Sequence, residues 1–248
     1  MYDETRNLLT QEFADISIVN NIVEQVASGQ TTLNTIAGKI GEKEQTVLYS
    51  IDKLINVGLV EKKKCITDEK NKKKTQYVLK DYMFRFLYAF IPKATSVIEM
   101  GQGETYYTKV VKPALHSFMD AIFEEMCRYY TLKQGIAGEY GCFITSVGTW
   151  WGAENITDKN GTVKPQSADI DVVALSEIDK KAVIGECKFK NEKIDKSIYE
   201  TLLRRGGLIA AKYKISKYIF FSLSGYTDWF ESLSDEDVLL LTLDSLYE

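Results

Sequence analysis

Two short apolar runs that carry charged residues constrain most strongly what this chain can fold into. The first is Ile170–Ala174, with the sequence IDVVA, and the second, about one hairpin later, is Ile184–Lys188, with the sequence IGECK. Short runs rich in β-branched residues are typical of buried strands. Side chains two positions apart on a strand point to the same face, so we expect Glu186 and Lys188 to lie together. A hairpin between the two strands would bring Asp171 beside Glu186.

The charged residues on these runs have the chemistry of a metal-dependent hydrolytic site. Two carboxylates at one point bind a hard divalent cation such as Mg²⁺ or Mn²⁺, which lowers the pKa of bound water and neutralises charge on a phosphoryl oxygen. Lys188 can orient the water or stabilise the transition state. We therefore predict Asp171 and Glu186 as metal ligands. Asp169 shares a strand face with Asp171 and is an alternative ligand.

The pattern around these runs predicts a mixed α/β domain. Helices are expected over Pro113–Leu132 and Asp195–Tyr213, with a short one near Thr227–Ser232. The expected strands are Cys142–Trp151, Ala168–Leu175, Ala182–Lys188, Lys217–Leu223 and Val238–Leu243. The core order of helix, three strands, helix and strand gives a mixed sheet flanked by helices.

The N-terminal part of the chain has a different periodicity. Its expected helices, each followed by a glycine within a few residues, are Ile16–Val26, Leu33–Ile40 and Lys43–Val57. Thr31 or Thr32 can cap the second helix. Strands at Leu59–Glu61 and Gln76–Leu79 enclose a lysine-rich segment. Three helices and a two-stranded wing predict a winged helix-turn-helix, with Gly41 in the turn.

The wing has enough positive charge to contact nucleic acid. Glu61–Lys80 contains eight lysines and three acidic residues, a net charge of +5, which suits phosphate binding. Glu42 and Glu44 lie near the start of the third helix and would repel phosphate, so docking of a protein on this domain is the alternative. The residues predicted to contact DNA are Lys43, Gln45, Tyr49, Lys62, Lys63, Lys64, Lys72, Lys73 and Lys74.

Composition narrows the remaining choices. The 248-residue chain has a net charge of −4, so any nucleic-acid binding must rest on local patches. Its four cysteines form no CxxC pair, which disfavours a zinc site and a disulfide framework. The start of the chain lacks an apolar signal core, and no run approaches the roughly 20 apolar residues of a membrane span. We expect a cytoplasmic protein with no membrane contact, and a homo-oligomer is left open.

Local sequence signals predict two domains and a connector. Pro92 ends an aromatic-rich helix over Asp81–Ile91, and Gly101 and Gly103 suggest a linker after it. The predicted organisation is a winged helix-turn-helix with flanking helices over residues 1–92, a linker over 93–105 and the mixed α/β domain over 106–248.

The pattern of Asp171 followed by Glu186-x-Lys188 on neighbouring strands resembles the PD-(D/E)xK nuclease superfamily. The order of helices and strands expected above matches the core of that superfamily. Its leading proline is replaced by Ile170 here, a departure that its members tolerate. The resemblance implies a further glutamate from the preceding helix, for which Glu124 is the first candidate and Glu125 the second.

A second resemblance covers nearly the whole chain. The stretches that carry it are Leu8–Gly29, Tyr77–Phe86, Gly148–Trp151, Ile170–Ala174 and Gly185–Lys188. They resemble the C-terminal half of archaeal-type P-loop ATPases, in which a nucleotide-binding domain precedes a winged helix and a nuclease-related domain. Because the chain contains no GxxxxGK[ST] motif, we expect it to be a part of such a protein without the N-terminal ATPase module.

The expected function is Mg²⁺-dependent hydrolysis of phosphodiester bonds in DNA. Asp171 and Glu186 would bind the metal, Lys188 would orient water or stabilise charge, and Glu124 would assist. Because a fold does not entail an activity, the alternative is a catalytically inactive regulatory or docking module of the parent ATPase.

For several other residues we expect a structural role. Trp150 and Trp151 are expected to pack at the end of the sheet, and His116, the only histidine, is expected on a helix surface or in the core. Cys187 should point away from Glu186 and Lys188 into the opposite layer. Arg204 and Arg205 could contact a DNA backbone or form solvated surface.

Overall fold

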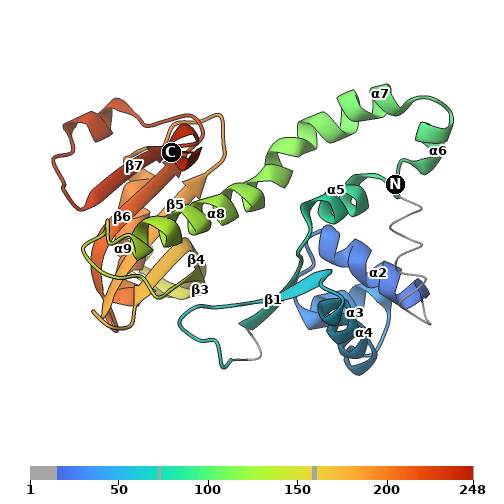
Figure 1. Ribbon diagram of the computed structural model, residues 1–248, viewed down its shortest axis with the longest axis horizontal. Helices are drawn as coiled ribbons and strands as arrows, with labels where there is room; N and C mark the ends of the chain where they lie inside the picture. The colour runs from blue at the N-terminus through green and yellow to red at the C-terminus, as the bar shows by residue number, and fades with distance from the viewer. Residues whose placement is uncertain (1–15, 72–73, 158–160, 248) are drawn as a thin grey trace. The chain divides into compact units, whose positions relative to one another are not determined.

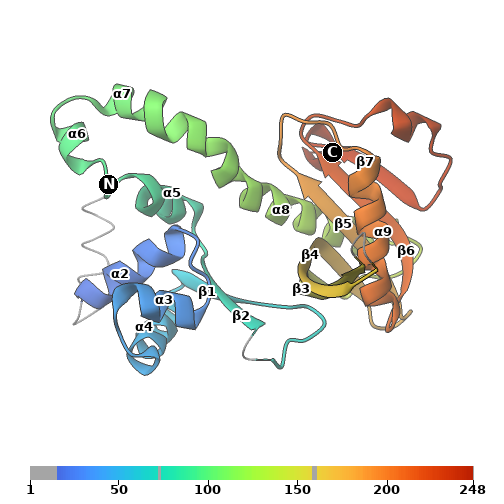
Figure 2. The same ribbon diagram turned by 180° about the vertical axis from the view of Figure 1, so that it is seen from behind.

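A computed structural model of the protein describes residues 16–71, 74–157 and 161–247 (Figures 1 and 2). The chain divides into two compact units. Unit 1 comprises Met1–Lys64 and Glu69–Leu115, and unit 2 comprises Cys65–Asp68 and His116–Glu248. The division after Leu115 falls within a helix.

Unit 1 consists of helices and a two-stranded hairpin. Its elements are α2 (Ile16–Ala27), α3 (Leu33–Ile40), α4 (Glu44–Asn56), β1 (Val60–Lys64), β2 (Thr75–Leu79), α5 (Tyr82–Phe90), α6 (Thr95–Glu99), α7 (Gly103–Tyr106) and the π-helix η2 (Tyr107–Val111). Thr32 caps α3 by accepting a hydrogen bond from the Thr35 N–H, and Gly41 ends α3 with φ of 74°. The three N-terminal helices and the hairpin lie where the sequence predicts them.

The core of unit 1 explains why these helices form. Apolar side chains at helical spacing on α2, α3 and α4 meet in one cluster. Its fully buried members include Ile22, Ile36, Val47, Ile51 and Leu54. The hairpin pairs Val60 with Leu79 and Lys64 with Thr75 in antiparallel register, and Val60 and Leu79 close the cluster from the hairpin side.

The segment predicted as a linker, residues 93–105, is largely helical. It contains α6 and most of α7, which continues through η2 into α8 (Lys112–Ile136). Gly101, with φ of 76°, breaks the helix only between α6 and α7. Pro113 has no N–H to donate inside the long helix, and the π-helical turn lies directly before it, with the Lys112 N–H donating to the Tyr107 carbonyl. The segment is therefore not the irregular stretch that the two glycines suggested, and Gly103 is the first residue of α7.

Unit 2 is a mixed sheet between helices. In the described residues its strand order is β3-β4-β5-β6-β7, with β3, β4 and β5 antiparallel and β5, β6 and β7 parallel. The elements besides α8 are β3 (Ser146–Thr157), β4 (Val163–Ser176), β5 (Lys181–Lys188), α9 (Lys196–Ala210), β6 (Lys214–Ser222), the 3₁₀ helix η3 (Asp228–Ser232), β7 (Val238–Thr242) and the 3₁₀ helix η4 (Asp244–Tyr247). The predicted mixed fold with flanking helices is confirmed at this level.

Helices α8 and α9 cover opposite faces of the sheet: α8 is in front in Figure 1, and α9 is in front when the molecule is seen from behind in Figure 2. Phe123 and Cys127 of α8 pack in one core cluster, and Leu202 and Ile209 of α9 pack in another. The parallel connection from β5 to β6 runs through α9, as parallel strands require a crossover. Strand β5 is buried on both faces, which explains its nearly continuous apolar sequence.

A β-bulge interrupts the pairing of β3 with β4. Gly148 pairs with Val173 and Trp150 with Ile170, so one residue of β3, Thr149, faces two residues of β4. Those two residues are Asp171 and Val172. A bulge re-aims side chains and frees backbone groups from the ladder, and here it falls on a residue predicted to be functional.

In the part of the chain that the structure describes, no helix is both long enough and apolar enough to cross a membrane.

Two helical glycines offer a test of the packing in unit 2. A Cβ at Gly135 of α8 would lie 2.3 Å from Ile144 Cγ1 and 2.6 Å from Ile144 Cβ. Overpacking costs about 1–3 kcal/mol, more than the roughly 1 kcal/mol that alanine gains over glycine in a helix. We expect Gly135→Ala to lower the free energy of unfolding, as measured by urea denaturation.

Gly207→Ala is the matched control, because among the described residues no heavy atom beyond the neighbouring residues and the backbone of α9 lies within 4 Å of a Cβ at this exposed position. It should raise the free energy of unfolding by about 0.5–1 kcal/mol. Equal effects of the two substitutions would contradict the packing described for Gly135.

Candidate functional site

A pocket of about 420 Å³ in unit 2 collects the predicted catalytic residues. It is lined by residues of α8, β4, β5 and α9 and of the segment after β5. The lining residues are Asp120, Phe123, Glu124, Asp169, Asp171, Glu186, Cys187, Lys188, Phe189, Lys190, Ser197, Ile198, Thr201 and Arg205. Glu125 is not among them, so Glu124 is the helical glutamate of this pocket.

Asp171 lies at the bulge of β4 and is 9% exposed. Its Oδ2 accepts a hydrogen bond of 2.9 Å from the backbone N–H of Cys187. The regular pairing of β4 with β5 ends at Val172 and Gly185, so the Asp171 side chain takes over where the backbone ladder stops. The carboxyl group is thereby fixed directly beside the segment that carries Glu186 and Lys188.

The electrostatic surroundings of Asp171 favour its neutral form. Burial raises the pKa of Asp171 well above its usual range, and the negative charges of Glu186 and Glu124 raise it further. The hydrogen bond from the Cys187 N–H and the charge of Lys188 act in the opposite direction without cancelling this effect. A buried carboxyl group next to two others is an unfavourable arrangement that a cation would relieve.

Glu186 and Lys188 lie on the same face of β5, as their spacing predicts. Glu186 is 8% exposed, and its Oε1 accepts a hydrogen bond of 2.5 Å from Lys188 Nζ. Burial alone would lower the pKa of Lys188, but the attraction of Glu186 and the hydrogen bond to it raise the pKa overall. Lys188 is therefore a charged group at the edge of the pocket.

Arg128 connects three parts of this site and was not identified from the sequence. Its Nη1 donates to Glu124 Oε2 (3.3 Å), to Thr149 Oγ1 (3.1 Å) and to the carbonyl oxygen of Asp171 (3.0 Å). Thr149 Oγ1 also donates to the Asp171 carbonyl, at 3.3 Å. These side chains satisfy a carbonyl group at the bulge and hold Glu124 of α8 next to β4. The i, i+4 spacing of Glu124 and Arg128 was the available signal.

Arg205 of α9 forms another wall of the pocket. Its Nε lies 3.4 Å from Glu154 Oε1, and its Nη1 donates to the backbone oxygen of Asp169 at 2.7 Å. Asp169 itself, the alternative metal ligand, is 63% exposed at its side chain and pairs with the same Nη1 at 3.2 Å. Glu154 on β3 is 4% exposed and was not identified from the sequence.

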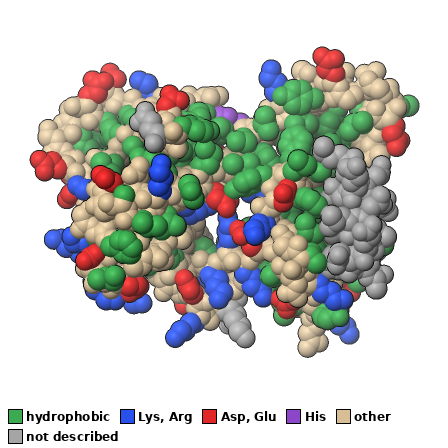
Figure 3. Space-filling model, viewed as in Figure 1, with side chains coloured by type: hydrophobic (Ala, Val, Ile, Leu, Met, Phe, Trp, Pro, Cys, Tyr) green, Lys and Arg blue, Asp and Glu red, His purple; other side chains and the backbone are tan. Residues whose placement is uncertain are grey.

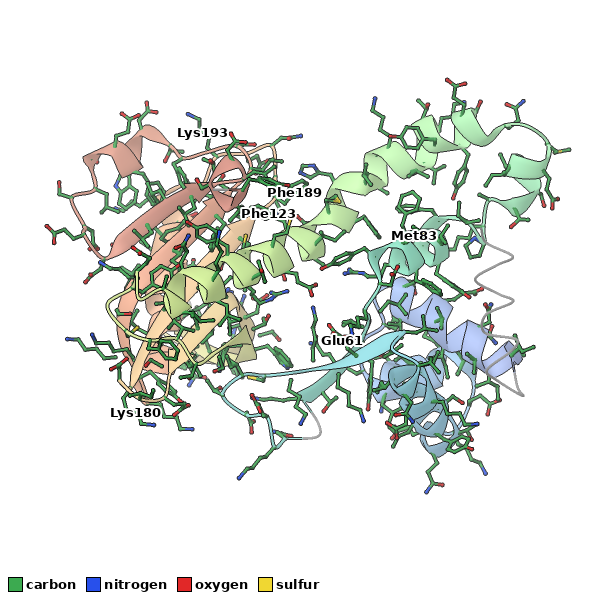
Figure 4. All side chains as sticks on the ribbon, in the orientation of Figure 1. Glu61, Met83, Phe123, Lys180, Phe189 and Lys193 are labelled. Atoms are coloured by element: carbon green, nitrogen blue, oxygen red, sulfur yellow. The ribbon has the colours of Figure 1, made fainter. Side chains whose placement is uncertain are left out.

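Other residues singled out in the sequence have structural surroundings. Trp150 packs in a core cluster of unit 2, as predicted. Cys187 packs in the cluster on the α8 side, as predicted, and burial with the hydrogen bond to Cys127 raises the pKa of its thiol well above the usual range. His116 lies 5.0 Å from the Phe189 ring, and its Nε2 is buried with no hydrogen-bond partner in the described residues. Phe123 and Phe189 lie side by side (Figure 4), with 5.3 Å between their ring centroids.

The donor set of the pocket fits Mg²⁺ or Mn²⁺ through two carboxylates. Among the described residues, no group of three or more His, Cys, Asp or Glu side chains is placed to hold a metal ion. Mg²⁺ does not need such a group, because it is commonly held by one or two carboxylates and keeps several waters. Asp171 and Glu186 each have one carboxylate oxygen engaged in the bonds described above, and within the part of the chain that the structure describes the other oxygen is left for a ligand.

Unit 1 contains a separate groove of about 700 Å³ between α3, α4 and the hairpin. Of the predicted DNA-contacting residues, Lys62 and Lys64 line it, together with Asp52 and Glu44. Lys62 Nζ forms an ion pair of 2.9 Å with Asp52, and the hydrogen bond to Asp52 raises the pKa of Lys62.

The remaining predicted DNA contacts lie on α4 and the hairpin. Lys43 and Gln45 are exposed at the start of α4, and Tyr49 is 64% exposed with Lys53 Nζ 4.4 Å from its ring centroid. Lys63 and Lys74 belong to the hairpin, whereas Lys72 and Lys73 lie outside the described residues. On the face shown in Figure 3, basic and acidic side chains are interspersed.

Comparison with known proteins finds similarity over parts of the chain. Residues 87–198 match DUF234, a family described as archaeal and bacterial proteins of unknown function. That range contains Glu124, Asp171, Glu186 and Lys188 and ends before Arg205. An uncharacterised protein of Methanocaldococcus jannaschii is 26% identical over 204 residues, which make up 82% of this chain and 43% of the relative. The chain thus spans less than half the length of this relative. No solved structure matches this chain.

The raised pKa of Asp171 gives a prediction about stability. A carboxyl group whose native pKa is raised contributes stability below its unfolded pKa and loses it as pH rises through the native pKa. Asp171→Asn keeps an oxygen to accept the Cys187 N–H but never ionises. We therefore expect the free energy of unfolding of the variant to increase relative to that of the wild type as pH rises. The total increase should be about 1.4 kcal/mol for each unit by which the native pKa of Asp171 is raised. Urea unfolding from about pH 4 to about pH 8 with EDTA measures this.

Asp179→Asn is the control, because its effect on stability should change with pH in the opposite direction. Hydrogen bonds from Ser176 Oγ and from the Phe143 N–H lower the pKa of Asp179. Its ionised form therefore adds stability above the unfolded pKa, and this is lost as pH falls through the native pKa. Asp179→Asn should destabilise at neutral pH and less in acid. The same pH trend for both variants would contradict the burial effect at Asp171.

Proposed function

We propose that unit 2 is a metal-dependent nuclease domain of the PD-(D/E)xK type that hydrolyses phosphodiester bonds in DNA. The observation that carries the proposal is that Asp171 of β4, Glu186 and Lys188 of β5 and Glu124 of α8 line one pocket. The order of α8, three antiparallel strands, α9 and a parallel strand supports it, because this is the core order of that superfamily.

Each residue has a role that follows from its surroundings. Asp171 and Glu186 bind Mg²⁺ or Mn²⁺, which when bound supplies activated water and neutralises charge on the phosphate. Lys188, held charged beside Glu186, stabilises negative charge that develops on the phosphate oxygens. Glu124 adds negative charge next to Asp171, and Arg128 fixes its position.

Unit 1 is proposed to bind DNA as a winged helix, with α4 and the β1–β2 hairpin as its contact elements. Support comes from the exposed Tyr49 and Gln45 on α4 and from the net charge of +5 over Glu61–Lys80. The pairing of Lys62 with Asp52 reduces its share in phosphate binding. The contact is therefore expected to be of moderate strength and sensitive to salt.

The wider context of the chain is a proposal as well. The relative from M. jannaschii is more than twice as long as the matched region, and the resemblance to archaeal-type ATPases suggests an N-terminal P-loop module in such longer proteins. We propose that this module, where it is present, controls access to the site in unit 2.

The second candidate function is a catalytically inactive regulatory or docking module. The specific observation in its favour is the pairing of Glu186 with Lys188 at 2.5 Å beside an Asp171 that favours its neutral form. Such a site has less negative charge to attract a cation. Isothermal titration of Mn²⁺ separates the two candidates: binding that is lost in Asp171→Asn supports the nuclease, and no binding supports the docking module.

Cleavage of DNA is the direct test of the nuclease. The wild type is incubated with Mg²⁺ or Mn²⁺ and supercoiled, linear, branched or single-stranded DNA. We expect cleavage that falls by at least about 100-fold in Glu186→Gln, which removes a metal ligand, and in Lys188→Gln, which removes a group that stabilises the transition state. Gel analysis of the initial rates measures this.

Glu177→Gln is the matched control, because Glu177 is an acidic residue of unit 2 that pairs with Lys180 outside the pocket. Its rate should equal that of the wild type. Cleavage that survives in Glu186→Gln and Lys188→Gln would show that the activity comes from another protein.

The DNA contact of unit 1 predicts a change in salt dependence. Replacing Lys72, Lys73 and Lys74 with glutamine should weaken binding to duplex DNA. The slope of log K against log salt should fall by about 0.9 for each phosphate that is no longer neutralised, and fluorescence anisotropy at several salt concentrations measures it. Replacing Lys93, Lys109 and Lys112, exposed lysines of unit 1 outside the hairpin, is the control. Equal slopes for both triple variants would remove the hairpin as a contact.

A further inference from the structure

Two adjacent arginines of α9 share one buried carboxylate but differ in what they face. Arg204 donates from Nε to Glu154 Oε2 at 2.8 Å and from Nη2 to Glu154 Oε1 at 3.2 Å. The hydrogen bond from Arg204 lowers the pKa of Glu154 despite the opposing effect of burial. The Arg204 side chain is 49% exposed and does not line the pocket, whereas Arg205 is 15% exposed and does.

Arg205 is fixed in place before any ligand binds. Glu154 holds its Nε, and both the backbone oxygen and the carboxylate of Asp169 hold its Nη1. In the described residues no hydrogen bond engages Nη2. A guanidinium group whose orientation is already set loses little entropy when it binds an anion.

The same helix presents further donors to the pocket. Ser197, Thr201 and Arg205 line it at intervals of four residues, which places them on one stripe of α9 about 12 Å long. The Ser197 hydroxyl is engaged by Asp195. Lys190, in the segment after β5, adds a second positive charge. In the described residues Lys188 is paired with Glu186, and Arg205 is paired with Glu154 and Asp169 through Nε and Nη1. The positively charged donors that remain for a ligand there are Nη2 of Arg205 and the ammonium group of Lys190.

We propose that the α9 wall of the pocket is a phosphate-binding subsite centred on Arg205, with Thr201 and Lys190 as auxiliary donors. The subsite takes a phosphodiester group of the substrate strand next to the one that lies at Asp171, Glu186 and Lys188. This inference rests on the proposed function for the identity of the strand. Its physical basis is Nη2 of Arg205, because a charged N–H donor whose orientation is already set forms a strong hydrogen bond with a phosphate oxygen.

The contrast of Arg205 with Arg204 provides the test. Arg205→Gln and Arg204→Gln each remove one partner of Glu154, so both report the structural effect of that loss. Arg205→Lys keeps the positive charge but lacks the guanidinium group that holds the donor in a fixed orientation. Two labelled single-stranded hexanucleotides serve as probes, one with phosphodiester linkages and one with uncharged methylphosphonate linkages. Binding to the full chain is measured by anisotropy in EDTA at several salt concentrations, and the unfolding midpoint of each variant is recorded.

We expect Arg205→Gln to weaken binding of the phosphodiester probe by about 10- to 100-fold and to reduce its salt slope by about 0.7. The affinity of Arg205→Lys for the phosphodiester probe should lie between those of Arg205→Gln and the wild type. Arg204→Gln should bind within about 2-fold of the wild type, and no variant should alter the weak binding of the methylphosphonate probe. Unit 1 is the same in all variants, so its contribution cancels in the comparison.

Three results would overturn the subsite. The first is that Arg204→Gln and Arg205→Gln lose the same affinity for the phosphodiester probe, and the second is that Arg205→Gln loses the same affinity for both probes. The third is that the wild type does not bind the phosphodiester probe. The failure of the proposed function is distinguishable, because binding is measured without metal and without cleavage. If Arg205→Gln loses affinity for the phosphodiester probe but the wild type never cleaves DNA, the subsite is supported and the nuclease is rejected. Cleavage by Arg205→Gln with unchanged KM and kcat rejects the subsite and leaves the nuclease standing.

Discussion

The site in unit 2 depends on how the backbone of Asp171 is held at the bulge of β4. There Thr149 faces both Asp171 and Val172, and the carbonyl of Asp171 accepts hydrogen bonds from Arg128 and Thr149 instead. The bulge aims the Asp171 carboxyl at the backbone N–H of Cys187, where it lies beside Glu186. Without the donors from Arg128 and Thr149, the bulge would leave a poorly satisfied carbonyl group, which costs about 1–3 kcal/mol. The network thus couples α8, β3, β4 and β5 at one point.

The charges around the pocket are balanced by specific partners and not by solvent. Asp171, Glu186 and Glu124 are close enough for the charges of the two glutamates to raise the pKa of Asp171, and Lys188 and Arg128 each pair with one of the glutamates. Outside the lining of the pocket, Glu154 is buried yet keeps a lowered pKa because Arg204 and Arg205 bond to it. Buried ion pairs of this kind add little to stability compared with apolar packing. Under the proposed function, the grouping of Asp171, Glu186 and Lys188 in one pocket has a catalytic explanation, since perturbed pKa values such as those of Asp171 and Lys188 cluster at functional sites.

The sequence predicted the parts of this arrangement that depend on local periodicity. The two-residue spacing of Glu186 and Lys188 on a strand was sufficient to place them together, and the helical repeats of unit 1 located its N-terminal helices. Contacts made over long sequence distances were not accessible: the bulge at Asp171 follows from the register of two strands, and the Glu154–Arg205 pair joins residues 51 positions apart. The linker expected over residues 93–105 stays a prediction, but the local signal at Gly103 was misread, because this glycine is the first residue of α7.

Lys188 and a bound ligand would compete for the carboxylate oxygens of Glu186. Lys188 occupies Oε1, so a ligand that needs both oxygens of Glu186 releases the ammonium group of Lys188. Under the proposed function, the released ammonium group can then bind a phosphate oxygen. Arg205 undergoes no such change, since its partners Glu154 and Asp169 lie outside this competition. Under the proposed function, Arg205 therefore acts as a fixed anchor for the strand, and Lys188 acts only after Glu186 has taken up its ligand.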